Sequence, residues 1–388
     1  MKIVTPAYYK DFKCIAGACT DTCCAGWDVD VDKESYKYYK KVKGAFGKRL
    51  KSVMVPSEDG GCTFTLNNGR CPFLNDENLC DLYTELGEDK LCETCDEFPR
   101  FINEYGAIRE IGIAPSCKTA GELIFSYKDS LSFDEKEDDT LQVSCNDIDP
   151  YLYMQLRSAR DIAYGMVSDR TYTINERCLL LMSFCMEIQK RMDADRDDLI
   201  TNVLIKYSDP DERNKIIEKI GHLYGKDKDE KSAEQLLHFF DSFKGMEVIN
   251  PDWNIYVEEI KHLFKDNSSS FIKQLFNEFD EYYNDRQTEY EQLLMYYVYR
   301  YFLDAVYDIN IVLKAKNALI GYLALKTMDV ADWYFNSKEL SFERQVDLAH
   351  LYSRQFEHSY YNFEVYKEWF MSKRRYSCAT LFKLLLMR

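Results

Sequence analysis

The sequence has no long apolar run of the kind that crosses a membrane or directs secretion. Its most apolar region, 293–325, is interrupted by five charges: Arg300, Asp304, Asp308, Lys314 and Lys316. No segment of the length needed to span a bilayer is free of charge. The first ten residues also lack the apolar core of a signal peptide. We therefore expect a soluble cytoplasmic protein without a membrane partner.

Several familiar catalytic signatures are missing as well. The sequence contains neither the Gly-x-Gly-x-x-Gly fingerprint of dinucleotide binding nor a Walker phosphate loop. The Cys-x3-Cys-x2-Cys pattern of radical chemistry is incomplete, because Gly26 stands where a third cysteine would follow Cys19 and Cys23. The five histidines show no spacing typical of metal ligands. These absences leave the cysteines as the strongest functional signal.

Basic residues are also outnumbered. The chain has 50 Lys and Arg against 66 Asp and Glu, which gives a net charge of −16. Such a charge opposes general binding to nucleic acid, so we expect no nucleic-acid partner. The length of 388 residues suggests about two domains.

The cysteines are concentrated near the start of the chain. Ten of the 14 fall in the first 117 residues: Cys14, Cys19, Cys23, Cys24, Cys62, Cys71, Cys80, Cys92, Cys95 and Cys117. Cytoplasmic thiols stay reduced, so this density favours metal binding over disulfides. Zinc needs only four ligands, which leaves room for one metal plus spare thiols, or for two metals. Spacing alone neither selects the ligands nor distinguishes zinc from [4Fe–4S].

Local patterns predict a mainly α fold of the α+β type. Alternating residues predict short strands at 27–31 and 63–66, and Asn68-Gly69 predicts a tight turn before Cys71. Asp32 can cap a following helix. We predict a small cysteine-rich metal domain with short β-hairpins, an acidic linker around Asp134 to Asp139, and a larger all-helical domain. Their boundaries are predicted at 1–128, 129–149 and 150–388.

Beyond the linker, apolar residues recur at helical spacing. The strongest stripe runs from Ile174 to Met192, and further helical patterns cover 271–283, 289–307 and 311–328. Cys178 and Cys185 lie on that stripe and Cys378 lies beside leucines, so we predict core positions for all three.

The cysteines stand within a series of ordered motifs: Phe12-Lys13-Cys14, Cys19-x-Asp21-Thr22-Cys23-Cys24-x-Gly26-Trp27, Arg70-Cys71-Pro72-Phe73-Leu74, Leu79-Cys80-Asp81-Leu82-Tyr83 and Cys95-x2-Phe98-Pro99-Arg100. Motifs in this order give the chain a resemblance to the flagellin lysine-N-methylase family, and the amino half also resembles the wider group of zinc- or iron-chelating cysteine-rich domains. The resemblance thins between about 195 and 285 and returns at Tyr352-Ser353-Arg354. One departure is Ser116-Cys117-Lys118, where the family usually has proline after the cysteine.

The resemblance implies a protein-lysine methyltransferase that uses S-adenosylmethionine, acts on flagellin in the cytoplasm and contains an iron–sulfur cluster. Density and family order together point to eight cysteines as the group that includes the ligands of a [4Fe–4S] cluster, with zinc as the alternative: Cys14, Cys19, Cys23, Cys24, Cys71, Cys80, Cys95 and Cys117. Two other functions stay open, namely a metal- or redox-responsive binding module without enzymatic activity and a zinc-stabilised scaffold.

A polar row near the carboxyl end supplies the candidates for catalysis. Arg354, His358 and Asn362 are spaced by four, so on one helix they would share a face. We predict that this row faces the junction of the two domains, where we place the active site. Arg354 or His358 would then contact the donor or the substrate lysine, although an exposed, hydrogen-bonded helix face explains the row equally well.

Overall fold

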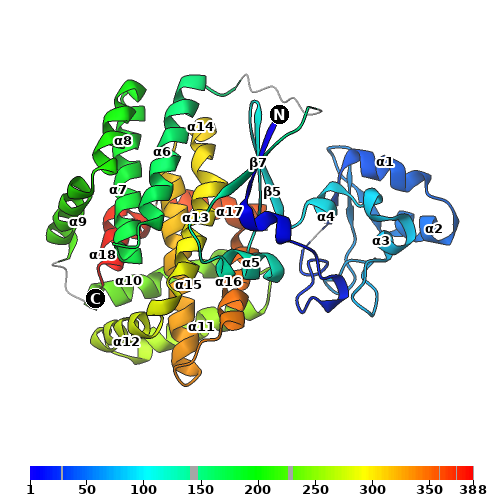
Figure 1. The fold of residues 1–388 in the computed structure, drawn as a ribbon. Coiled ribbons are helices and arrows are strands. Elements are labelled where there is room, and N and C mark those ends of the chain that lie inside the picture. The colour runs from blue at the N-terminus through cyan, green and yellow to red at the C-terminus, as the bar shows by residue number, and fades with distance from the viewer. Residues whose placement is uncertain (28, 140–146, 226–229, 358, 373, 388) are drawn as a thin grey trace.

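The protein consists of a large body and a smaller lobe that holds most of the cysteines (Figure 1). The computed structural model describes residues 1–27, 29–139, 147–225, 230–357, 359–372 and 374–387. We call residues 14–97 the cysteine lobe and the rest the main body. Each part has its own cluster of buried apolar side chains. The predicted mainly α fold, with short strands near the amino end, is confirmed.

The cysteine lobe is built on a short three-stranded sheet. Its strands are β2 (Val29–Val31), β3 (Met54–Pro56) and β4 (Cys62–Phe64), and β4 pairs antiparallel with both others. Four helices surround the sheet: α1 (Lys33–Lys41), α2 (Gly44–Val53), α3 (Asp81–Leu86) and α4 (Glu93–Glu97). The rings of Tyr39, Phe64 and Phe73 fill the space between them.

A tight turn brings the middle of the lobe back to its first cysteines. Asn68 and Gly69 have φ values of 51° and 74°, a left-handed conformation that asparagine and glycine tolerate best. The turn returns the chain so that the amide of Cys71 donates to the carbonyl of Cys24 at 2.8 Å. The predicted turn before Cys71 is therefore confirmed.

A second, four-stranded sheet belongs to the main body. Its order is β5-β6-β1-β7, in which β1 runs parallel to β6 and antiparallel to β7. The strands are β1 (Lys2–Pro6), β5 (Arg100–Tyr105), β6 (Ile108–Ile113) and β7 (Phe133–Glu137). The hairpin of β5 and β6 leads out of the cysteine lobe and back to the helices (Figure 1).

The acidic stretch predicted as a linker forms part of this sheet. Residues Phe133–Glu137 are strand β7, whose carboxylates stay exposed because the strand lies at the sheet edge. Glu135 pairs with Lys2 of β1 at 2.6 Å. The sequence pattern contains no sign of this strand, since an edge strand with little buried surface does not need apolar periodicity.

The two cores do not coincide with the predicted domain boundaries. The lobe core takes its residues from between Val29 and Cys92. Tyr8, Phe101 and Phe125 lie within the predicted first domain but pack in the core of the main body. Buried cores do not define where a domain begins or ends, so the boundaries at 1–128, 129–149 and 150–388 stay predictions.

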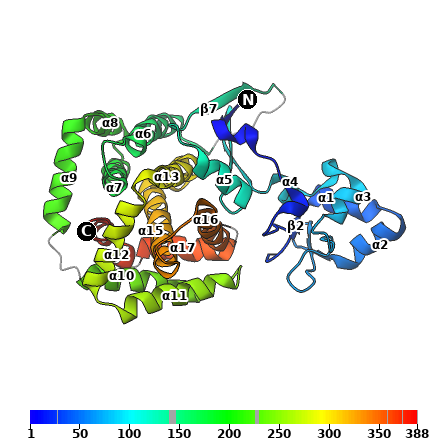
Figure 2. The same cartoon turned by 60° about the horizontal axis from the view of Figure 1, so that its bottom comes forward.

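The main body is a bundle of helices around α15 (Ile311–Phe335), as Figure 2 shows. Helices α7 (Ile174–Met192) and α13 (Thr288–Tyr301) pack against α15, and α6 (Pro150–Ser168) packs against both α7 and α13. The remaining helices of at least eight residues are α5 (Lys118–Ser126), α8 (Ile200–Ser208), α9 (Pro210–Tyr224), α10 (Glu230–Asp241), α11 (Asp252–Asp266), α12 (Ser269–Tyr282), α16 (Phe342–Glu357), α17 (Tyr360–Ser372) and α18 (Cys378–Leu385). No described helix combines the length and apolar character needed to cross a bilayer.

Local sequence signals begin several of these helices. The Asp32 carboxylate accepts hydrogen bonds from the first turn of α1, as predicted. Asp149 does the same for α6. Thr173 and Glu176 form a reciprocal capping box at the start of α7, the helix that the apolar stripe predicted. Cys178 and Cys185 on α7 are fully buried, which confirms their predicted core positions.

Buried ion pairs fasten the sheet and the helices together. Arg160 on α6 donates to Glu110 on β6 at 2.7 Å, and their side chains are only 8% and 3% exposed. Arg177 on α7 pairs with Glu291 on α13 at 2.8 Å. A buried charge that loses its partner is strongly destabilising, so these pairs hold β6, α6, α7 and α13 in one arrangement.

Candidate functional site

The eight predicted metal ligands are all free thiols in the structure. Cys71 is buried, Cys14 is exposed and the other six are half-buried. Among the described residues, no group of three or more Cys, His, Asp or Glu side chains is arranged closely enough to hold a metal ion. The structure therefore shows where the thiols lie without showing a formed metal site.

Four of the eight thiols belong to the core of the lobe, and we call them the lobe thiols: Cys24, Cys71, Cys80 and Cys95. Cys80 forms a β-bridge with Leu74, three residues after Cys71. Burial, with smaller contributions from the nearby Cys24 and Cys80 thiols, raises the pKa of the Cys71 thiol to about 12. Cys62 and Cys92 are buried in the same core.

The other four lie outside the lobe core, and we call them the junction thiols: Cys14, Cys19, Cys23 and Cys117. Cys117 precedes α5 and packs against the core of the main body. Burial raises its pKa, and the Cys19 and Cys14 thiols raise it further. These thiols thus meet where the lobe joins the main body.

The donor chemistry of both groups fits a soft metal. Each supplies four thiols, the number that binds one tetrahedral zinc or one [4Fe–4S] cluster. The vicinal Cys23 and Cys24 fall into different groups because only Cys24 packs against the lobe core, yet their two thiols lie within hydrogen-bond reach of each other. Their disposition allows either one metal with spare thiols or two metals.

Arg354 on α16 holds the cysteine lobe against the main body. Its guanidinium donates to Asp21 at 2.7 Å and to the carbonyl of Ala25 at 2.5 Å. His350, one turn earlier on α16, shares a 2.8 Å hydrogen bond with the other Asp21 oxygen. Burial alone would raise the pKa of Asp21, but His350 and the Arg354 charge outweigh burial and lower the pKa to about 2. Asp21 is therefore a fixed anion between two cysteines of the opening motif.

Close packing around Gly26 completes this contact. Gly26 has a φ of +89°, and a Cβ there would lie 3.3 Å from Arg354 Nη2 and 3.1 Å from the carbonyl of Ile249. The Arg354 guanidinium also lies over the ring of Trp27, 5.3 Å from its centroid. The opening motif therefore positions the lobe as well as supplying thiols.

The predicted polar row does not form on one helix. Helix α16 ends at Glu357 and α17 begins at Tyr360, so Asn362 lies on a different helix from Arg354. Asn362 is buried and donates to the carbonyl of Gln355 at 2.9 Å. His358 lies outside the described residues. Arg354 does face the junction as predicted, and its catalytic role stays a prediction.

Glu357, at the end of α16, organises a buried cluster of tyrosines. Tyr301 donates to its carboxylate at 2.5 Å and Tyr296 at 2.8 Å. Arg300 completes the cluster with an ion pair at 3.3 Å. Burial raises the pKa of both tyrosines well above its ordinary value, so both act as hydrogen-bond donors.

Beside this cluster is a cavity of about 280 Å³, which we call the aromatic pocket. It lies between α15, α17 and the chain that follows α13. Its walls combine five aromatic rings with charged, polar and apolar groups: Tyr301, Tyr307, Phe363, Tyr366 and Phe370, with Asp304, Asp308, Leu313, Lys314, Asn317 and Lys367. Aromatic faces next to carboxylates suit a cationic ligand.

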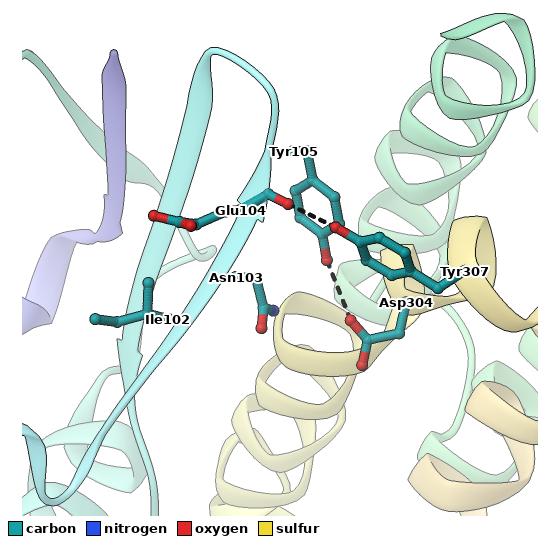
Figure 3. A pocket seen from close by; sticks show the side chains of 6 residues that line it. All are labelled: Ile102, Asn103, Glu104, Tyr105, Asp304 and Tyr307. Atoms are coloured by element: carbon teal, nitrogen blue, oxygen red, sulfur yellow. Dashed lines mark hydrogen bonds between the residues drawn. The ribbon is translucent and has the colours of Figure 1, made fainter. Parts of the chain in front are cut away.

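A second cavity of about 270 Å³, the hairpin pocket, lies between β5 and α14 (Ala305–Asp308) (Figure 3). It is lined by Ile102, Asn103, Glu104, Tyr105, Asp304 and Tyr307. Tyr307 donates to the backbone carbonyl of Glu104 at 2.7 Å, and Tyr105 donates to Asp304 at 3.3 Å. Figure 3 shows the two tyrosine rings and the Asp304 carboxylate gathered on one side of the hairpin.

Asp304 and Tyr307 line both pockets. Burial raises the pKa of Asp304 above its ordinary value, although the Lys314 charge and the Tyr105 hydroxyl partly offset this effect. The sequence analysis did not identify Asp304 as a pocket residue, because Asp304 and Asp308 were noted only as charges that interrupt an apolar region. Their position in the second half of an apolar segment was the one available signal.

Comparison with protein families gives a match that covers more than half of the chain. Residues 160–384 match the FliB lysine N-methylase C-terminal domain. The match includes every residue of the aromatic pocket and excludes the cysteine lobe.

Curated proteins give matches over a shorter stretch. The flagellar biosynthetic protein FliU of Salmonella muenchen is 27% identical over 147 residues, which cover 35% of this chain and 83% of FliU. The lysine-N-methylases of Salmonella choleraesuis and Salmonella typhimurium are each 27% identical over 146 residues, or 34% of this chain. The aligned segment spans only 35% of either lysine-N-methylase. No solved structure matches.

Proposed function

The chain belongs to the family of the FliB lysine N-methylase C-terminal domain, and from this premise we propose that it is a protein-lysine N-methyltransferase that uses S-adenosylmethionine. One observation carries the proposal: the family match extends over the helices that enclose the aromatic pocket. The methyl donor is a sulfonium cation, and aromatic faces attract cations.

We propose flagellin as the protein substrate and the cytoplasm as the place of reaction. The flagellar name of the FliU relative supports a flagellar substrate. The net charge of −16 would attract a lysine-bearing surface over a distance.

The reaction requires a site that removes a proton from the lysine amine. A lysine amine attacks the methyl group only when it is neutral, and its pKa in water is about 10.4. A group in the site must therefore take the proton at neutral pH. The carboxylates beside the aromatic pocket, Asp304 and Asp308, are suited to this role, and Asp308 is already paired with Lys314.

We further propose that the eight predicted cysteines include the ligands of a [4Fe–4S] cluster. The lobe thiols and the junction thiols each offer the four thiolates that such a cluster takes. When bound, the cluster would supply a one-electron redox centre and would crosslink the chain segments that carry its cysteine ligands. Zinc would supply the crosslink alone.

The test is methyl transfer to purified flagellin. Protein purified without oxygen should add about 14 Da per methyl to flagellin lysines when S-adenosylmethionine is present, and nothing when the donor is omitted. Tandem mass spectrometry would locate each methylated lysine. If metal-loaded protein adds no mass to either native or unfolded flagellin, the chain is better explained as a metal-dependent binding module.

A further inference from the structure

The two pockets adjoin in a way that suits a reaction between two ligands. Their volumes, about 270 and about 280 Å³, are each slightly below the roughly 300 Å³ at which single-ligand pockets usually begin. Asp304 and Tyr307 line both cavities, which therefore adjoin at these two residues. Group transfer requires the donor and the acceptor to meet from opposite sides of one point.

We propose that the hairpin pocket receives the side chain of the target lysine, and that Asp304 binds its amine and takes its proton. The sulfonium end of the donor then lies in the aromatic pocket. This inference rests on the proposed function and adds the position of the acceptor site and the identity of its base.

Within the described part of the chain Asp304 forms no ion pair, although the charges of Lys314 and Arg300 lie close enough to act on it. Lys314 pairs with Asp308, and Arg300 pairs with Glu357. Tyr105 donates to one oxygen of Asp304, and nothing in the described part of the chain binds the other. A lysine ammonium entering the hairpin pocket would supply the missing charged partner.

The shape of the hairpin pocket suits a lysine side chain. The rings of Tyr105 and Tyr307 are stacked, with centroids 6.2 Å apart, beside the Asp304 carboxylate (Figure 3). Tyr307 is 49% exposed and so reaches the surface. A lysine combines an apolar stem with a charged tip, which matches the exposed Tyr307 ring and the Asp304 carboxylate next to it.

The aromatic pocket, which Asp304 also lines, suits the methyl donor. The rings of Tyr301 and Phe363 are stacked, with centroids 6.0 Å apart, and Tyr366 and Phe370 line the same cavity. These faces favour a sulfonium over a neutral thioether, so they would hold the donor more tightly than its product.

The step balances without a further reactant. The lysine ammonium gives a proton to the Asp304 carboxylate, and the nitrogen lone pair then attacks the methyl carbon. The carbon–sulfur bond breaks with its electron pair going to sulfur, which leaves a neutral thioether and a methylated ammonium. The proton on Asp304 is released to water before the next turnover.

Binding experiments test the acceptor site apart from turnover. The metal-loaded protein, saturated with S-adenosylhomocysteine, is titrated with flagellin and with flagellin whose lysines have been acetylated. Wild type should bind the unmodified form about tenfold more tightly, because acetylation removes the charge that Asp304 pairs with. Asp304→Asn should abolish most of that preference and lower kcat/KM for methylation about a hundredfold.

Two further variants control the result. Asp134→Asn removes a carboxylate from β7, far from both pockets along the sheet, and should keep the wild-type preference. Tyr105→Phe removes the hydrogen bond to Asp304 and should lower kcat/KM several-fold. Circular dichroism confirms folding, and Asp304→Ser, which also lacks the carboxylate, replaces Asp304→Asn if the latter unfolds.

The outcomes separate the two proposals. If wild type methylates flagellin while Asp304→Asn keeps both the binding preference and kcat/KM, the acceptor site is wrong and the proposed function stands. If wild type neither methylates flagellin nor distinguishes it from acetylated flagellin, the proposed function fails and the acceptor site fails with it.

Discussion

The cysteine lobe and the main body reach stability by different means. The lobe core has ten buried side chains, and three of them are cysteines: Cys62, Cys71 and Cys92. The main body surrounds α15, a helix buried along most of its 25 residues, with aromatic rings and buried ion pairs. A core as small as that of the lobe usually needs a crosslink or a metal. The comparison leads us to propose that a bound metal would stabilise the lobe, whereas packing stabilises the main body.

Removing the metal should have the largest effect, because it should unfold the cysteine lobe and leave the main body folded. Treatment of the anaerobically purified protein with a strong chelator should make residues 14–97 sensitive to a protease while the main body stays resistant. Mass spectrometry of the fragments measures this difference. Equal resistance of the lobe before and after metal removal would show that its packing suffices.

Breaking the buried ion pair should weaken the main body next most strongly. Glu110→Gln leaves Arg160 buried without its anion and should cost about 3–5 kcal/mol of unfolding free energy, measured with urea. Glu104→Gln is the matched control on the same hairpin. Its pair with Arg109 is more exposed, so the loss should stay within about 1 kcal/mol. Similar losses in both variants would contradict the fastening role of Arg160.

Loosening the contact between the two parts should have a smaller effect. Asp21→Asn weakens hydrogen bonds to Arg354 and His350, and we expect a loss of about 1.5–3 kcal/mol. Small-angle scattering should then show a larger radius of gyration. Asp11→Asn, an exposed change near the lobe, should leave both values unchanged. An unchanged radius in the Asp21 variant would mean that other contacts hold the lobe.

The smallest effect should come from a cysteine that only packs. Cys185→Ala should cost about 1–2 kcal/mol and leave the metal content unchanged, because Cys185 is a buried part of the main core. Cys71→Ala in the lobe should lower the metal content measured by elemental analysis. Metal loss from a folded Cys185→Ala protein would overturn the distinction between the two kinds of cysteine.

Local periodicity made much of the fold predictable. The stripe from Ile174 to Met192 and the Asp32 cap need only neighbours in sequence, so the helices they predict are present. Strand β7 was missed because its pairing with β1 depends on residues far away in sequence.

The site was harder to predict for the same reason. Asp21 and Arg354 are 333 residues apart, and no local pattern links them. Asp304 could be recognised as a pocket residue only from the fold, which places the β5–β6 hairpin beside α14. The thiols were recognisable from their density, but their division into two groups depends on which core each one packs against.

The central claim is that the main body binds the methyl donor while the cysteine lobe carries the metal. Hydrogen exchange of the metal-loaded protein, with and without S-adenosylmethionine, tests it most directly. We predict slower exchange in peptides that cover 301–317 and 363–370, the two segments that line the aromatic pocket, and little change in residues 14–97. Protection confined to residues 14–97 would contradict the claim and place the donor on the lobe.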